Sequence, residues 1–249
     1  MPESVTQILE APVSVDSLTT KIFADGADLD QILALAENPR IKGFTTNPSL
    51  MWKAGLTDYA EFAQRLLERI TDHPVSFEVF ADDAKEIKRQ ARIISRWGPN
   101  VYVKVPVTTT SGESMAPLVR QLSESGIQVN VTAVFTPSQV ETITEAVKNG
   151  APSYISVFAG RIADAGVDPL PVMREAVEIM GEAPSSELIW ASPREVLNVV
   201  QADSVGCHII TVTHDLLKKL ACIGKDLDSF SLETVQMFHR DAVSAGFEL

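Results

Sequence analysis

Short apolar runs rich in β-branched residues alternate with longer segments of helical periodicity along the chain. The apolar runs predict eight strands, over residues 21–25, 43–47, 75–80, 101–107, 128–135, 154–160, 187–192 and 208–213. The periodic segments predict helices over residues 28–37, 58–70, 84–97, 113–125, 138–148, 171–180 and 193–202. Several of these helices open with Asp, Ser or Pro, as helices commonly do. This alternation is typical of a parallel α/β protein.

The number of strand–helix units in 249 residues is that of a single (β/α)8 barrel, the TIM-barrel fold. A doubly wound open sheet is the structural alternative, but no G-x-G-x-x-G sequence follows the first predicted strand. No linker or low-complexity stretch indicates a second domain. We therefore expect one barrel domain over residues 1–249, with residues 1–20 as an N-terminal extension.

Residues 226–249 predict one extra helix at the C-terminus. Its apolar positions lie roughly on one side of the helix: Leu232, Val235, Phe238 and Val243. Such a face is available to cover a barrel end or a neighbouring subunit.

Composition and charge exclude several functional classes. The chain has 21 Lys and Arg against 33 Asp and Glu, a formal net charge of −12, and 45% hydrophobic residues. It can therefore fold around a core, and it offers no basic stripe to nucleic acid or to an anionic membrane surface. Because it shows neither a leader pattern nor a run of about 20 apolar residues, we expect a cytoplasmic protein. Its two cysteines and four histidines show no ligand spacing, so no metal is expected.

Polar residues interrupt the predicted strands, which in such a barrel are buried on both faces. They fall within or at the C-terminal ends of strands one to seven: Asp25, Thr45, Asn47, Glu78, Lys104, Asn130, Thr132, Ser156 and Ser192. Barrel enzymes carry their active sites at that face. The set is consistent with one pocket.

Lys104 is the sharpest of these signals, because an ammonium in the middle of VYVKVPV needs a partner or a lowered pKa. A neutral amine there would be a nucleophile toward carbonyl groups. The alternative is a structural ion pair with Glu78 or Asp25. Those two carboxylates could also cap the next helix. The buried Asn, Thr and Ser side chains could simply hold loop backbone.

Arg161, just after strand six, and Ser192 and Arg194, at the end of strand seven, bring two guanidiniums and a hydroxyl to one end of the barrel. With the free amides of a helix N-terminus, this group suits a phosphate dianion. The alternative for each arginine is a surface ion pair.

Seven segments resemble the transaldolases of the short kind that includes the fructose-6-phosphate aldolases. They are FADGAD (23–28), GFTTNPS (43–49), SFEVFADD (76–83), VYVKVPVT (101–108), NVTAVF (130–135), SVFAGRI (156–162) and ASPR (191–194). The resemblance runs from about residue 21 to the C-terminal helix. It implies sugar-phosphate substrates, no organic cofactor, and a homo-oligomer, either a dimer or a decamer.

The resemblance also implies roles for individual residues. Lys104 would form a Schiff base with the C2 carbonyl of a ketose donor, and Asp25 would move the proton of the C4 hydroxyl. Glu78 and Thr132 would position a water that relays protons at the imine. The remaining implied residues bind substrate, with the last three on its phosphate: Thr46, Asn47, Asn130, Ser156, Phe158, Arg161, Ser192 and Arg194.

Glu78 and Phe158 favour transfer of the three-carbon unit. In the family that the chain resembles, transaldolases tend to have Glu and Phe at these two positions, whereas the aldolases have Gln and Tyr. A phenyl ring cannot donate a hydrogen bond to the catalytic water. The expected donors are sedoheptulose 7-phosphate or fructose 6-phosphate, with an aldose phosphate as acceptor. Release of dihydroxyacetone, as in a fructose-6-phosphate aldolase, is the alternative.

Two departures leave the substrate open. Pro193 stands where an aromatic residue is usual, and TTTSGES (108–114) is more polar than expected. A longer or sulfonated sugar therefore remains an alternative, as does a specialised pathway in place of the pentose phosphate pathway. A barrel that binds sugar phosphates without turning them over is a further alternative, although the buried Lys104 argues against it.

Overall fold

Eight parallel strands close into a barrel in the computed structural model, which describes residues 14–248. The strands are β1 (Lys21–Asp25), β2 (Ile41–Thr45), β3 (Val75–Glu78), β4 (Val101–Pro106), β5 (Val129–Val134), β6 (Tyr154–Val157), β7 (Glu187–Trp190) and β8 (Ile209–Thr213). Each strand pairs with its neighbours in chain order, and β1 pairs with both β2 and β8. The predicted (β/α)8 barrel is confirmed.

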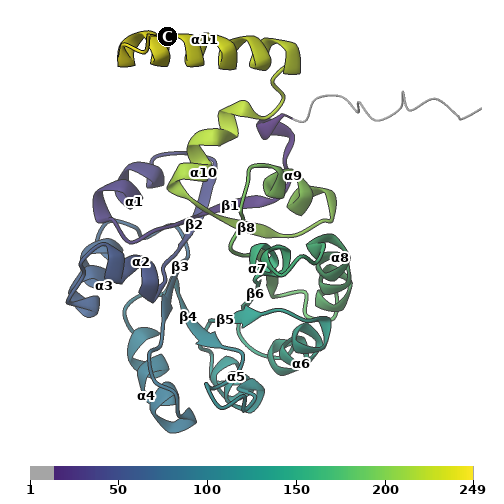
Figure 1. Ribbon diagram of the computed structural model, residues 1–249. Helices are drawn as coiled ribbons and strands as arrows, with labels where there is room; N and C mark the ends of the chain where they lie inside the picture. The colour runs from purple at the N-terminus through teal and green to yellow at the C-terminus, as the bar shows by residue number, and fades with distance from the viewer. Residues whose placement is uncertain (1–13, 249) are drawn as a thin grey trace, which may run out of the picture. The chain divides into compact units, whose positions relative to one another are not determined.

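Helices follow the strands and surround the barrel, as Figure 1 shows. They are α1 (Leu29–Ala36), α2 (Pro48–Lys53), α3 (Tyr59–Leu67), α4 (Ala84–Ile94), α5 (Ala116–Glu124), α6 (Pro137–Val147), α7 (Ala159–Asp164), α8 (Pro169–Met180), α9 (Leu197–Ser204) and α10 (His214–Lys219), with α11 (Leu227–Ala245) near the C-terminus. The side chains of Asp28, Asp58 and Asp83 accept hydrogen bonds from the first turns of α1, α3 and α4. These caps satisfy amides that have no partner inside the helix.

The short helices α2, α7 and α10 were not predicted, and two predicted strands run too far because of them. The strand expected over 43–47 ends at Thr45, because Asn47 caps α2 and Pro48 opens it. The strand expected over 154–160 ends at Val157, since α7 begins at Ala159. The helix expected over 193–202 begins only at Leu197.

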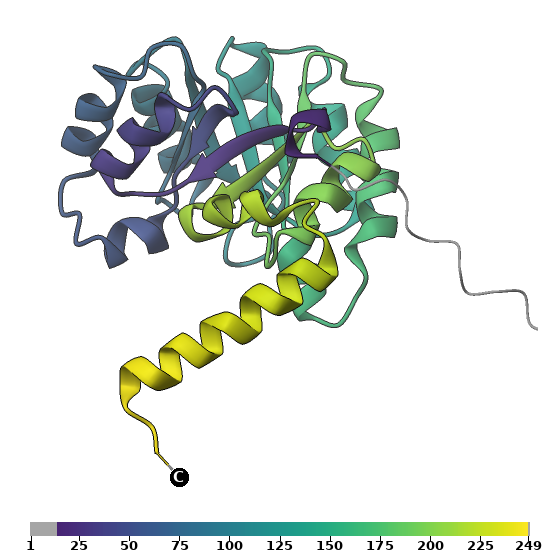
Figure 2. The ribbon, with the colours of Figure 1, turned by 90° about the horizontal axis from the view of Figure 1, so that it is seen from above.

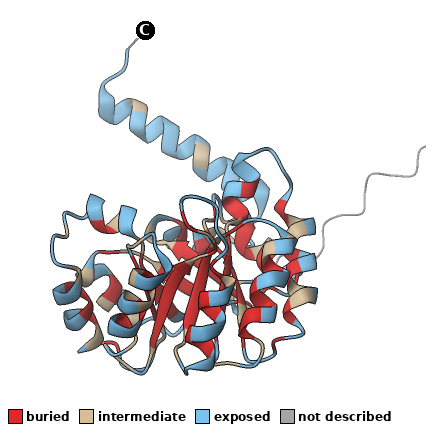
Figure 3. Ribbon diagram, turned by 90° about the horizontal axis from the view of Figure 1, so that it is seen from below, coloured by how far each residue is buried: buried red, intermediate tan, exposed pale blue. Residues whose placement is uncertain are grey.

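The strands are mostly buried, whereas the helices are exposed on their outer sides (Figure 3). Figure 2 shows these helices around the strands. Aromatic rings from β1, β4 and β6 fill the barrel interior below the polar ends of the strands. Tyr102 stacks on Tyr154 with ring centroids 4.0 Å apart, and Phe23 meets Tyr154 edge-on at 5.7 Å. Gly43 makes room for this layer, because a Cβ there would lie 2.5 Å from the Phe23 ring. The layer forms the floor on which the polar residues rest.

Contacts between Cα atoms divide the chain into two units. Residues 19–218 form the unit that contains all eight strands. Among the described residues, 14–18 and 219–248 form the other unit, which contains the turn Val15–Ser17, the turn Leu220–Cys222 and α11. The predicted C-terminal helix over 226–249 is α11, which ends at Ala245 with Gly246 in the left-handed region. Residues 1–13 of the predicted N-terminal extension lie outside the described residues.

Candidate active site

A cavity of about 470 Å³ opens at the C-terminal ends of the strands. Nine of the predicted site residues line it: Asp25, Asn47, Glu78, Lys104, Thr132, Ser156, Phe158, Arg161 and Ser192. Thr46, Asn130 and Arg194 are not among its lining residues. Because parallel strands end at the same face, residues distant in the sequence meet in one pocket.

The Lys104 side chain lies at this cavity with only 8% of its surface exposed. Its Nζ donates to the backbone carbonyl of Thr46 at 2.7 Å and lies 3.1 Å from Oε2 of Glu78. The ion pair with Glu78, one of the alternatives left open by the sequence, is therefore present. It holds the amine at the cavity, where a ligand can reach it.

Asp25 lies at the end of β1 and is held by two side chains from the next strand and turn. Thr45 donates to Oδ1 at 2.8 Å, and the amide of Asn47 donates to Oδ2 at 3.2 Å. Burial raises the pKa of Asp25 above its ordinary value, although the Lys104 charge and these two hydrogen bonds oppose the rise. A carboxyl group with a raised pKa is suited to exchanging protons near neutral pH.

Asn130 and Thr46 hold other groups in place instead of facing the cavity. Asn130 is fully buried, donates to the Ser76 hydroxyl at 3.0 Å, and accepts from the Ser156 hydroxyl at 2.7 Å. The Thr46 hydroxyl donates to the Ser76 carbonyl at 2.9 Å. Of these residues only Ser156 lines the cavity, so Asn130 positions it from behind.

The backbone is strained at two non-glycine residues that line the cavity, Ala133 (φ 59°) and Ser192 (φ 62°). Ala133 belongs to a bulge in which β5 places two residues opposite Ser156 alone. Ser192 approaches α7 so closely that a Cβ on Gly160 would lie 1.6 Å from its carbonyl oxygen. Strain of this kind concentrates at functional sites.

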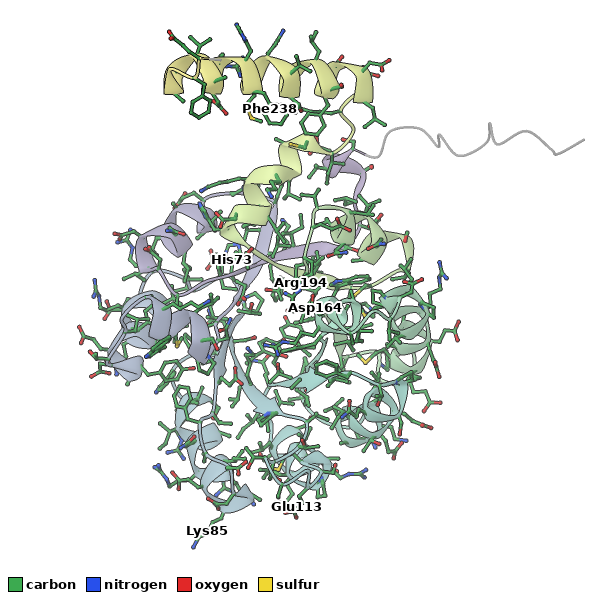
Figure 4. The ribbon with its side chains drawn as sticks, in the orientation of Figure 1. His73, Lys85, Glu113, Asp164, Arg194 and Phe238 are labelled. Atoms are coloured by element: carbon green, nitrogen blue, oxygen red, sulfur yellow. The ribbon has the colours of Figure 1, made fainter. Side chains whose placement is uncertain are left out.

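The predicted anion end contains a carboxylate that the sequence did not reveal. Arg194 donates from Nε to both carboxylate oxygens of Asp164, at 2.9 and 3.0 Å, and from Nη1 to the Ser192 hydroxyl at 3.0 Å. Figure 4 shows Arg194 and Asp164 next to each other. The Arg161 guanidinium lies 5.7 Å from the centre of the Phe158 ring and lines the cavity. Arg194 therefore forms the ion pair that the sequence left as an alternative, while Arg161 faces the site.

Comparison with known proteins shows the family of the chain. Residues 22–249 match the family model described as Transaldolase/Fructose-6-phosphate aldolase. The chain belongs to this family. The resemblance seen in the sequence is thus confirmed.

Two relatives illustrate the match. A protein named probable transaldolase from Dehalococcoides mccartyi is 33% identical over 201 residues, which are 80% of this chain and 89% of the relative. Another of the same name, from Herpetosiphon aurantiacus, is 34% identical over 221 residues, 87% of this chain and 96% of the relative. A solved structure from Burkholderia cenocepacia, 13% identical with a TM-score of 0.56 over 82% of this chain and 92% of its own, shares the fold alone.

Two residues of the candidate site, Thr211 and Tyr59, were not predicted from the sequence. Thr211 lines the cavity from β8, with its hydroxyl 2.5 Å from that of Thr45. A polar residue inside the apolar run 208–213 was the available signal. Tyr59, on α3, accepts a hydrogen bond from the Glu78 amide at 2.6 Å. No signal in the sequence distinguishes it from an ordinary aromatic on the buried face of a helix.

Two further observations concern residues 14–248 only. No group of three or more His, Cys, Asp or Glu side chains in this part of the chain could hold a metal ion. None of its helices combines the length and the apolar character needed to cross a membrane.

Replacing Thr45 by Val should raise the pKa of Asp25 further, because it removes a hydrogen bond that favours the charged carboxylate. Titration of the Asp carboxyl carbons by NMR measures this. Thr211→Val is the control, since it leaves the bond from Thr45 to Asp25 in place, and its shift should be smaller. An unchanged or lowered pKa in Thr45→Val would contradict the assignment.

Proposed function

We propose that the protein is a transaldolase that moves a dihydroxyacetone unit from a ketose phosphate to an aldose phosphate through a Schiff base on Lys104. The observation that carries the proposal is the Lys104 amine, buried at the cavity between the Thr46 carbonyl and the Glu78 carboxylate. Asp25 lines the same cavity. Sedoheptulose 7-phosphate and fructose 6-phosphate are the proposed donors.

In the proposed reaction, Lys104 gives a proton to the paired Glu78 carboxylate, and its amine attacks C2 of the donor. Protons from the amine and from Glu78 then reach the C2 oxygen, which leaves as water and gives an iminium ion. Asp25 takes the proton of the C4 hydroxyl as the C3–C4 bond breaks, and the bonding electrons move into the iminium to form an enamine. The first aldose leaves. The enamine then attacks the aldehyde of the acceptor, and Asp25 returns its proton to the new C4 oxygen. Water bound near Glu78 and Thr132 finally hydrolyses the imine and releases the new ketose.

Transfer competes with protonation of the enamine, which would release dihydroxyacetone. Phe158 lines the cavity with a phenyl ring, and its neighbour Phe135 lies 5.8 Å away between ring centres. Neither ring offers a hydroxyl to orient a water toward the enamine. This apolar wall supports transfer over aldol release.

The Asp164–Arg194 pair supports a second candidate, a transaldolase for a sugar with a different anionic end. Arg161 and Arg194 bring two positive charges, and Asp164 offsets one of them. A singly charged group such as a sulfonate would match that balance. Comparing turnover of phosphorylated and sulfonated ketoses distinguishes the two candidates.

Borohydride treatment with fructose 6-phosphate, in the absence of an acceptor, should trap a three-carbon adduct on Lys104, because the enzyme would stall at the enamine and its imine. Intact mass and peptide mapping measure the adduct. Lys104→Ala should lose both adduct and turnover and stay folded by circular dichroism. Lys85→Ala, at an exposed position on α4, is the matched control and should keep both. Full activity in Lys104→Ala would eliminate the Schiff-base mechanism.

Arg161→Ala should raise KM for phosphorylated ketoses by about 10- to 100-fold, which is the loss expected for a hydrogen bond between charged groups. KM for unphosphorylated dihydroxyacetone as donor should change by less than about twofold. Steady-state kinetics on both substrates measure the difference. Arg174→Ala, on an exposed position of α8, is the control. Equal losses on both substrates would remove Arg161 from the anion site.

We further propose that the protein is a homo-oligomer, a dimer or a decamer. None of the residues of α11 is buried, and Leu232, Val235, Phe238 and Val243 are each 58% to 66% exposed. Apolar exposure of this kind is typical of a helix that packs on a partner.

Light scattering should therefore give a mass that is a multiple of 27.1 kDa. The double variant Val235→Asp/Phe238→Asp should shift that mass toward 27.1 kDa, whereas Arg240→Ala on the same helix should not. A monomeric wild-type protein would refute the proposal.

A further inference from the structure

The ladder of hydrogen bonds between β2 and β3 stops one step early, at the point where the Lys104 amine is held. The Thr46 amide donates to the Ser76 carbonyl at 3.2 Å, as expected for parallel strands in the register Phe44–Val75. In a regular parallel ladder, the next bond would run from the Glu78 amide to the Thr46 carbonyl. That bond is not made.

Both of its groups have other partners. The Glu78 amide donates to the Tyr59 hydroxyl at 2.6 Å, and the Thr46 carbonyl accepts from Nζ of Lys104 at 2.7 Å. A buried amide requires an acceptor, so without Tyr59 the nearest one in the ladder would be the Thr46 carbonyl. Because the Tyr59 hydroxyl accepts from the Glu78 amide, the Thr46 carbonyl is available to Nζ of Lys104.

The position of Tyr59 is fixed by its surroundings. It is the first residue of α3, and its ring meets Phe77, Phe80 and Trp97 edge-on, with centroids 6.0, 4.6 and 5.6 Å apart. Burial raises the pKa of Tyr59, which keeps the hydroxyl neutral and able both to accept and to donate. It also lies 3.2 Å from the Glu78 carbonyl, to which it donates.

We infer that Tyr59 is a positioning residue for Lys104: it ends the β2–β3 ladder early so that the Thr46 carbonyl is free to hold the amine. The inference rests on the proposed Schiff-base function. Nζ then has two anchors from different strands, the Thr46 carbonyl and the Glu78 carboxylate. Two anchors hold the nitrogen in one place, which favours attack on a carbonyl bound in the cavity.

In Tyr59→Phe, the Glu78 amide and the Lys104 amine should compete for the Thr46 carbonyl. The phenyl ring keeps the packing against Phe77, Phe80 and Trp97, but the Glu78 amide loses its acceptor and turns to the Thr46 carbonyl. The Lys104 amine then loses one anchor. The effect should fall on formation of the imine and not on substrate binding, which other residues of the cavity carry.

The experiment measures steady-state kinetics, the rate of borohydride trapping with fructose 6-phosphate, and thermal unfolding for the full chain. In Tyr59→Phe, kcat and the trapping rate should both fall about tenfold, with KM within about twofold. Tyr154→Phe is the matched control, because it also removes a buried tyrosine hydroxyl and Tyr154 does not line the Lys104 cavity. It should keep kcat and trapping near wild type.

The outcomes are distinguishable. If wild type is not trapped with any ketose, the proposed function fails. If wild type is trapped and Tyr59→Phe is trapped at the same rate, the role of Tyr59 is refuted while the function stands. A Tyr59→Phe variant that loses thermal stability and activity to the same extent as Tyr154→Phe would also refute it, because the hydroxyl would then act only through general stability.

Discussion

The rest of the site depends on the burial of one amine in the interior of a closed barrel. Lys104 lies on the middle of β4, where every neighbouring strand is buried, so its Nζ must find polar partners inside the protein. It finds them on β3 and just beyond β2, in the Glu78 carboxylate and the Thr46 carbonyl. Next to these partners, the Glu78 amide donates to the Tyr59 hydroxyl and not to the Thr46 carbonyl.

Around this amine, the polar residues divide into those that face the cavity and those that hold them. Asp25, Ser156 and Ser192 face it. Thr45 and Asn47, which line the cavity themselves, hold Asp25, and the fully buried Asn130 holds Ser156 from behind. Loss of any of these hydrogen bonds would leave a polar group without that partner and disturb the residue that it holds. Backbone strain at Ala133 and Ser192 occurs at the same cavity, where the surrounding barrel can maintain it.

The anion end is built differently from the amine end. Arg194 and Asp164 are partly exposed, and their ion pair is of the kind that contributes little to stability. The pair instead affects the charge beside the proposed anion site. The Arg194 hydrogen bond keeps the pKa of Asp164 below its ordinary value, so the carboxylate stays charged. The specificity of this family member for the charged end of its substrate is therefore proposed to depend on the balance among Arg161, Arg194 and Asp164.

The barrel and most of the residues that line its cavity could be predicted from the sequence alone. Eight apolar runs alternating with helical segments permit few other folds, and polar residues at strand ends are conspicuous because burial makes them unfavourable. The sequence did not show where β2 and β6 end, because the helices that follow them are too short to give a periodic pattern. After β2, for example, Asn47 caps such a helix and Pro48 opens it. Only the tertiary structure paired Arg194 with Asp164, gave the Thr46 carbonyl to Lys104, and brought Tyr59 to Glu78. These are contacts between side chains and backbone groups far apart in the chain, and residue type and periodicity contain no information about them until the barrel closes.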